Sequence, residues 1–271
     1  MTSSSTAWLA SYPKSGNTWV RAQLSSLQHG EDFDLNRMDE SSSNDRMDMS
    51  LGMPVGDLSD EDVAGALRLS WALRKPNEAK FIRRKTHRPW LNAQDGFPIP
   101  WQPHGACAIY VVRDPRGVVA SWAHHLGISQ ESAAEHMSVA RSDLHRSDNH
   151  GDESFTSWSR HVSSWLDNCG LPQMVVRYED MAEDPERELI RMANFLQINA
   201  SKAQIQAAVA ACAFDELVVS EALNGFREAA TPGRVFFRKG DPNSWKDEVP
   251  DHVLQKIVAD HGEVMSRLGY L

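Results

Sequence analysis

A short segment near the start of the chain combines a lysine, a glycine and small hydroxyl residues, since Ser11–Trp19 reads SYPKSGNTW. It follows an apolar run, Ala7–Tyr12, and opens a stretch with helical periodicity. A turn from a strand into a helix presents backbone N–H groups at the positive end of the helix, which favours anions. Lys14 precedes Gly16, whereas the lysine of a Walker A loop follows a second glycine. The segment predicts an anion-binding loop, with an ordinary turn and a solvated lysine as the alternative.

A second group of candidate residues lies in FIRRKTHRPW, after a predicted strand over Ala79–Arg83. A histidine at the carboxyl end of a strand in an open α/β sheet is well placed to reach a ligand. Histidine titrates near neutral pH, so His87 is a candidate general base. Lys85 lies two residues earlier, and in an extended segment both side chains share one face. A structural histidine is the alternative, because the chain has eleven.

Further bases are spaced as a phosphate site requires. In VVRDPRGVVASW, Arg113 ends a predicted strand and Ser121 follows eight residues later, two turns into the next predicted helix. The planar guanidinium of an arginine matches a phosphate. Arg238 and Lys239 precede Gly240 in a predicted loop, where adjacent bases could surround a second phosphate. The alternative for Arg113 is a strand-end arginine that pairs with Asp114 or with solvent, and for Arg238 and Lys239 it is a solvated surface loop.

The elements that must position these residues alternate between strands and helices. Strands are predicted at Ala7–Tyr12, Ala79–Arg83, Cys107–Val112 and Gln173–Val176. Helices are predicted at about Asn17–Leu27, Asp60–Leu73, Pro115–His125, Trp158–Leu166, Glu183–Leu196 and Ala203–Ala211, and at the C-terminus. The segments 31–62 and 231–245 are predicted to be loops, and 127–154 has no clear pattern. This alternation implies a single α/β domain over residues 1–271, with a central parallel sheet flanked by helices on both faces.

Composition narrows the class of protein. The chain has 271 residues, 41% of them hydrophobic, and a net charge of −9 that is concentrated in the segment 31–62. The rest is neutral and lacks a long basic stripe, which disfavours nucleic acid as a partner. The longest apolar run, about Ala106–Val112, is too short to span a membrane, and the start lacks a basic signal-peptide region. Three cysteines without a CxxC pair favour a reducing compartment, so we expect a cytoplasmic protein.

Taken in order, these segments resemble the sulfotransferases that use 3′-phosphoadenosine 5′-phosphosulfate (PAPS), and the cytosolic type most closely. YPKSGNTW is similar to the 5′-phosphosulfate loop of that family, and KTH to the triplet that supplies its histidine base. Arg113 and Ser121 match its 3′-phosphate motif, including the spacing. Tyr178 in VVRYEDMAEDP and Phe214 in CAFDEL match adenine contacts, and RKGDPNSWK resembles the loop that closes on the 3′-phosphate. The motifs cover nearly the whole chain.

The resemblance implies a P-loop-like fold and in-line transfer of a sulfuryl group to a hydroxyl or amine, with 3′-phosphoadenosine 5′-phosphate (PAP) as the product. It implies that His87 is the base, that Lys14 stabilises the leaving phosphate and that Lys85 holds the sulfuryl oxygens. Ser121 would hold Lys14 away from the sulfate until the acceptor arrives. The implied cofactor-binding residues are Lys14, Ser15, Gly16, Asn17, Thr18, Trp19, Arg113, Ser121, Tyr178, Phe214, Arg238, Lys239 and Gly240. No metal is expected, because lysines and arginines supply the positive charge.

The chain departs from the family pattern at two points. Asn243-Ser244 replaces the usual Gly-Asp after RKG, and the C-terminal KxxxTVxxxE dimerisation motif is absent, so both monomer and homodimer stay open. The acceptor is predicted to be a small molecule, as for a bacterial enzyme that tailors a natural product, with Tyr12 and Trp90 as candidate contacts. Packing beneath a loop is the alternative for Trp90. A P-loop nucleotide kinase and a non-catalytic module that binds adenosine bisphosphate are the alternative functions.

Overall fold

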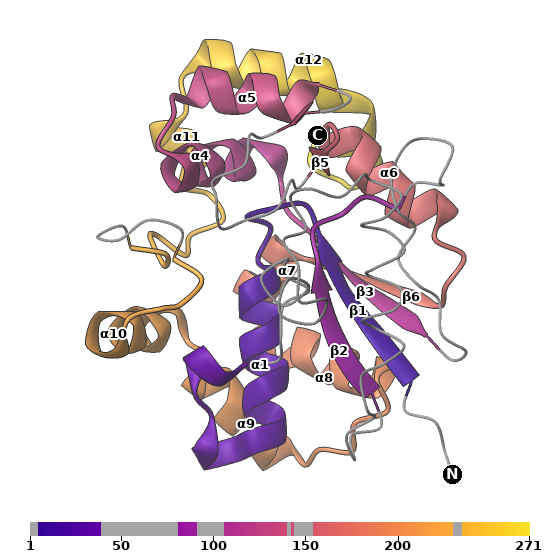
Figure 1. The fold of residues 1–271 in the computed structure, drawn as a ribbon, viewed down its shortest axis with the longest axis vertical. Helices are drawn as coiled ribbons and strands as arrows, with labels where there is room; N and C mark the ends of the chain where they lie inside the picture. Colours follow the sequence, from indigo (N-terminus) through magenta and orange to yellow (C-terminus); the bar gives the residue numbers. More distant parts are fainter. Residues whose placement is uncertain (1–4, 39–80, 91–105, 140–141, 144–153, 230–234) are drawn as a thin grey trace, which may run out of the picture.

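A four-stranded parallel sheet lies at the centre of the molecule (Figure 1). The computed structural model describes residues 5–38, 81–90, 106–139, 142–143, 154–229 and 235–271. The strands of the sheet are β1 (Ser5–Ser11), β2 (Phe81–Thr86), β3 (Cys107–Val112) and β6 (Gln173–Arg177). Their order is β2-β1-β3-β6, and each neighbouring pair is parallel. The carboxyl ends of β1, β2 and β3 therefore meet at one edge, where parallel sheets bind ligands.

The side chains of β1 alternate between two buried clusters, one on each face of the sheet. Trp8 and Ala10 belong to one cluster, and Ala7 and Leu9 to the other. Both sets are apolar, as expected for a strand that is buried on both faces. The strand β3 follows the same pattern, so these two central strands anchor the helices on either side.

Among the described residues, four helices pack against each face of the sheet. The cluster that contains Trp8 also takes residues from α4 (Pro115–Leu126), α5 (Gln130–Ser138), α6 (Trp158–Asn168) and α12 (Asp251–Arg267). The cluster that contains Leu9 takes residues from α1 (Asn17–His29), α7 (Tyr178–Glu183), α8 (Pro185–Phe195) and α9 (Lys202–Ala211). Figure 1 shows these two sets of helices on opposite sides of the sheet.

A third, smaller cluster joins late segments of the chain to α1. It includes Leu217 of α10 (Phe214–Asn224), Phe226 and Phe237, which pack with Ala22 of α1. The remaining short elements are the 3₁₀ helices Gly30–Asp32 and Leu35–Arg37, the antiparallel pair β4 (Ser142–Asp143) and β5 (Ser154–Phe155), and α11 (Trp245–Glu248). The third cluster brings Phe237, the residue before Arg238, close to α1.

The predicted α/β architecture with a parallel sheet between helices is confirmed. The strand predicted at 79–83 is shifted, because the ladder with β1 extends through Lys85 and Thr86. The helix predicted at 183–196 is confirmed as α8, which begins at Pro185 after the capping residue Asp184 and ends at Phe195. Helices α5, α7, α10 and α11 have no counterpart among the predicted helices. The helix predicted at 60–73 and most of the segment 31–62 lie outside the described residues.

Within the described ranges, no single helix has the length and apolar character needed to cross a membrane; α9 and α10, bent by 53° at their junction, meet those criteria only as a pair.

Candidate active site

The loop between β1 and α1 has the backbone of a strained, tightly packed turn. Lys14 has φ 63° and Gly16 has φ 99°, and α1 begins at the next residue. Positive φ is uncommon for a residue with a side chain, and such strain is concentrated at functional sites. A Cβ on Gly16 would lie 2.7 Å from Cδ2 of Tyr178, so only glycine allows the Tyr178 ring to approach this closely. The loop that the sequence predicts to bind an anion is therefore built around Gly16.

Side chains of the same loop fix it to the end of β1. The amide nitrogen of Asn17 donates to the carbonyl of Leu9 at 2.8 Å and to Oγ of Ser11 at 3.3 Å. Ser15 is fully buried, and its Oγ has no hydrogen-bond partner among the described residues. A buried hydroxyl normally has a partner, so an orphaned one beside a helix N-terminus is suited to a bound anion.

The side chain of Lys14 is half-buried in a positively charged environment. Its Nζ lies 4.0 Å from the centroid of the Phe236 ring, in a cation–π contact. Burial, followed by the charges of Lys85 and Arg113, lowers the pKa of Lys14 to about 8, although Glu221 and Glu228 act in the opposite direction. The ammonium is therefore mostly charged at pH 7 and titrates just above it.

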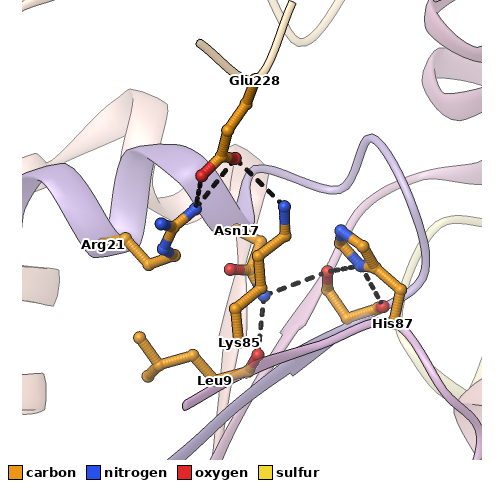
Figure 2. A network of polar contacts seen from close by, with 7 residues as sticks. Leu9, Asn17, Arg21, Lys85, His87 and Glu228 are labelled. Atoms are coloured by element: carbon orange, nitrogen blue, oxygen red, sulfur yellow. Dashed lines mark hydrogen bonds and ion pairs between the residues drawn. The ribbon is translucent and has the colours of Figure 1, made fainter. Parts of the chain in front are cut away.

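His87 follows β2 directly and is anchored to β1 (Figure 2). Its Nδ1 lies 2.9 Å from the carbonyl oxygen of Ser11 and 3.1 Å from Oγ of the same residue. Because a carbonyl only accepts, Nδ1 carries the proton, and the lone pair is on Nε2. Burial and then the charge of Lys85 lower the pKa of His87 well below its usual value. The imidazole is thus neutral at pH 7, with Nε2 available as a base.

A buried histidine, His161, supports the backbone of the half-buried His87. Nε2 of His161 donates to the carbonyl oxygen of His87 at 3.0 Å, and Nδ1 of His161 accepts from the hydroxyl of Tyr110 at 2.9 Å. Burial lowers the pKa of His161 to about 4, so the ring is neutral and keeps one donor and one acceptor. Strand β3 and helix α6 thereby hold the segment that carries His87.

A buried ion-pair network lies beside these groups (Figure 2). Glu228 accepts from Nη1 of Arg21 at 2.8 Å and from Nζ of Lys85 at 3.1 Å. Burial alone would raise the pKa of the Glu228 carboxyl, but Lys85 and Arg21 lower it to about 2. Lys85, which the sequence identifies as a candidate, is therefore paired with an acid that the sequence did not identify.

The residues predicted to contact adenine lie next to one another. The rings of Trp19 and Tyr178 meet edge to face, 5.7 Å between centroids, and the Tyr178 hydroxyl donates to the carbonyl of Gly240 at 2.8 Å. Phe214 packs against Gly240, where a Cβ would lie 2.4 Å from the ring. The guanidinium of Arg113 lies 4.2 Å from the centroid of the Tyr178 ring. Tyr178 thus connects the loop between β1 and α1, Arg113 and the loop after Phe237.

Arg238 and Lys239 share one carboxylate partner. Glu248 of α11 accepts from both terminal nitrogens of Arg238, at 2.6 and 2.8 Å, and lies 3.0 Å from Nζ of Lys239. Burial opposes ionisation of Glu248, but its two partners lower its pKa to about 2. The two bases are therefore held together, next to the Gly240 carbonyl that Tyr178 contacts.

Comparisons with known proteins agree with this arrangement. The model of the sulfotransferase domain family matches residues 4–269. The chain belongs to the sulfotransferase family. Sulfotransferase 1E1 of Mus musculus is 22% identical over 262 residues, covering 92% of this chain and 79% of that protein. Flavonol 3-sulfotransferase of Flaveria bidentis is 23% identical over 268 residues, covering 92% and 78%. The protein is thus a sulfotransferase enzyme.

Solved structures show the same fold. Retinol dehydratase in complex with androsterone and PAP aligns with a TM-score of 0.65 and 20% identity, over 96% of this chain and 80% of that one. Mouse sulfotransferase SULT7A1 complexed with PAP aligns with a TM-score of 0.63 and 18% identity, over 97% and 84%. These likenesses extend the match from sequence motifs to the whole architecture.

Four predicted site residues of this sulfotransferase have no contact that assigns a role, and one of them is Thr18, which is buried in the first turn of α1. Ser121 lies half-buried on α4, whereas the Lys14 ammonium rests on Phe236. Tyr12 and Trp90 are buried, with Tyr12 edge-on to His161 and Trp90 packed on Trp165. Their roles stay predictions.

Several residues of the site were missed by sequence reasoning. Ser11 lies within the quoted loop motif, yet nothing in its type indicates that it anchors His87. The sequence around Glu228 and that around Glu248 carry no local signal, because their partners come from distant segments or from the basic loop. His161 was not singled out among the histidines. Among the described residues, no group of three or more His, Cys, Asp or Glu side chains is arranged to hold a metal ion.

Proposed function

We propose that this sulfotransferase moves the sulfuryl group of PAPS to a hydroxyl or amine of a small-molecule acceptor. The observation that carries the proposal is that the end of β1 both contacts His87 and leads into the predicted anion-binding loop. Ser11 accepts the Nδ1–H of His87, and the residues directly after it form the loop with Lys14, the orphaned Ser15 hydroxyl and Gly16. A base and an anion loop are thus fixed to each other through one strand end.

The residues present fit PAPS. The buried hydroxyl of Ser15 and the backbone N–H groups of the loop would donate hydrogen bonds to the 5′-phosphosulfate, with Asn17 bracing the loop and Thr18 beside it in the first turn of α1. Trp19, Tyr178 and Phe214 would hold the adenine. The 3′-phosphate would be held by basic residues and their neighbours, namely Arg113, Ser121, Arg238, Lys239 and Gly240. When bound, PAPS supplies the sulfuryl group.

The chain's own residues would then act on protons and charge. Nε2 of His87 would take the proton of the acceptor hydroxyl or amine, a contribution of roughly 10²–10⁴-fold in rate. The ammonium of Lys14 would donate to the phosphate oxygen that gains charge, typically worth about 3–4 kcal/mol in the transition state. Lys85 would orient the sulfuryl oxygens from the same face as His87.

Calorimetric titration tests the nucleotide site. We expect PAP to bind on the order of 100-fold tighter than 5′-AMP, because two charge-assisted contacts to the 3′-phosphate are lost with AMP. ATP serves as the control for a nucleotide kinase. Equal binding of ATP and PAP would favour the kinase alternative, and binding of PAP without transfer from PAPS to any of a panel of phenols and amines would favour the non-catalytic module.

The molecules named for the relatives indicate which class of acceptor to test first. Flavonol 3-sulfotransferase is named for a plant flavonol, and the retinol dehydratase structures contain androsterone or retinol. All three are small molecules with a hydroxyl group. We therefore propose that the acceptor panel should start with phenols and alicyclic alcohols, and continue with aryl amines.

A further inference from the structure

The Glu228 carboxylate bridges two bases that come from different elements. Oε1 and Oε2 accept from Nη1 of Arg21 on α1, at 2.8 and 3.0 Å, and Oε2 also accepts from Nζ of Lys85 on β2 at 3.1 Å (Figure 2). We propose that Glu228 is a positioning residue for sulfuryl transfer, which holds the Lys85 ammonium in place beside His87. This inference rests on the proposed function, in which Lys85 orients the sulfuryl oxygens.

The bridge is anchored on its far side by a residue that cannot move into solvent. The side chain of Arg21 is 1% exposed, while those of Glu228 and Lys85 are 15% and 18% exposed. Arg21 therefore fixes the carboxylate, and the carboxylate fixes the lysine. A lysine side chain has a flexible stem with many rotamers, so a fixed partner decides where its charge lies.

The loop that carries Glu228 is itself tied down at several points. The side chain of Asn36 donates to the carbonyl of Gly225 at 3.0 Å and accepts from the backbone N–H of Arg227 at 3.0 Å. Phe226 packs against Phe236 with ring centroids 4.8 Å apart, and Phe236 in turn lies under the Lys14 ammonium. The same body of side chains thus positions both lysines of the proposed site.

The charge of Glu228 also matters to its neighbours. Lys14 is faced by Lys85 and Arg113, which lower its pKa, and by Glu221 and Glu228, which raise it. Removal of the Glu228 charge would leave Lys14, Lys85 and Arg113 with one negative charge fewer nearby to offset their mutual repulsion. The bridge therefore keeps Lys85 in place and limits the repulsion between the cations of the site.

Competitive labelling of lysines tests the bridge without any nucleotide. Wild type and Glu228→Gln are treated with acetic anhydride at pH 8, and the acetylation rate of Lys85 is measured by peptide mass spectrometry. We expect the rate to rise several-fold in Glu228→Gln and to stay unchanged in Glu216→Gln, which removes the same charge from an exposed position on α10. An equal Lys85 rate in wild type and Glu228→Gln overturns the proposal.

The variant is chosen to keep the fold. A glutamine retains an acceptor for Arg21, whereas alanine would leave a buried guanidinium without that partner. Glu228→Asp, which keeps the charge but shortens the side chain, is the second variant, and we expect it to give a labelling rate between those of wild type and Glu228→Gln. Thermal unfolding checks that both proteins are folded. If they are, a Lys85 acetylation rate in Glu228→Asp equal to that of wild type also counts against the bridge.

A double-mutant cycle separates positioning from mere stability. With PAPS and 4-nitrophenol, Glu228→Gln is expected to lower kcat about 10–100-fold, the usual cost of a misplaced group, with little change in KM for PAPS. In the background of Lys85→Ala, the same substitution should have no further effect. An equal loss in both backgrounds overturns the proposal. Failure of wild type to bind PAP would instead reject the proposed function, while the labelling result still decides whether Glu228 holds Lys85.

Discussion

The titration of Lys14 gives a quantitative test of the phosphate loop. The structure lowers the pKa of this ammonium to about 8 through burial and through Lys85 and Arg113, with Glu221 and Glu228 opposing. A phosphate that contacts the ammonium favours its charged form. Binding of PAP near pH 8 should therefore draw a proton from the buffer onto Lys14.

The expected proton uptake follows from the fraction of Lys14 that is neutral before binding. At pH 8 half of the side chains are neutral, so uptake approaches about 0.5 proton per PAP. At pH 7 about one tenth are neutral, and uptake falls to about 0.1. The nucleotide adds little at pH 8, because the second pKa of a phosphate group is about 6. His87 adds little as well, since its pKa lies well below its usual value.

The assay is calorimetric titration of PAP in buffers that differ in ionisation enthalpy, where the slope of the apparent binding enthalpy gives the number of protons. Lys14→Arg is the matched variant, because a guanidinium remains charged at pH 8 and occupies the same backbone position. We expect its uptake to be close to zero. Absent uptake in wild type at pH 8, or the same uptake in Lys14→Arg, would refute the assignment of Lys14 to the phosphate site.

Four other predictions concern the rest of the site and the stability of the fold. His87→Ala should abolish most sulfuryl transfer with PAP affinity nearly unchanged, and full turnover would contradict its role as base. Arg113→Ala should weaken PAP binding by about 2–5 kcal/mol, so an unchanged calorimetric affinity would remove it from the site. Gly240→Ala should weaken PAP binding roughly tenfold, because φ is 68° and a Cβ would lie 2.4 Å from the Phe214 ring; wild-type affinity would argue against this packing. Burial of neutral His161, with a pKa of about 4, should make the free energy of unfolding fall by roughly 3 kcal/mol from pH 6.5 to 4, since the unfolded chain binds the proton first. Urea unfolding across this range checks the slope, and an identical slope in His161→Asn would contradict it.

Local patterns were enough to predict the centre of the fold. The apolar runs of β1 and β3 read as buried strands, and Pro115 after Asp114 marked the start of α4 as the structure has it. The loop at 11–19 was recognised from its lysine, glycine and position before a helix. These features depend on residues close together in sequence, and they can therefore be predicted from a local pattern.

Other elements have no such local pattern, or lie in a stretch whose polar composition hides their helical pattern. Helix α10 starts after Ala213, which offers no side-chain cap, and its Val219 and Leu223 are exposed, so its apolar residues follow no simple helical stripe. Helix α5 does have a cap at Ser129, but it buries only Ala133, Ala134 and Met137 within a polar stretch. The pairing of Glu228 depends on segments 143 and 207 residues away, which no local pattern reports.

That separation has a consequence for the order in which the protein matures during synthesis. Arg21 leaves the ribosome 207 residues before Glu228. At roughly 5–20 residues per second, the interval is on the order of 10–40 s. Through this time the first helix carries a guanidinium without the carboxylate that neutralises it in the finished core. The nascent chain therefore cannot form the bridge from Arg21 through Glu228 to Lys85 until residue 228 has emerged, and a chain truncated before Glu228 would never form it.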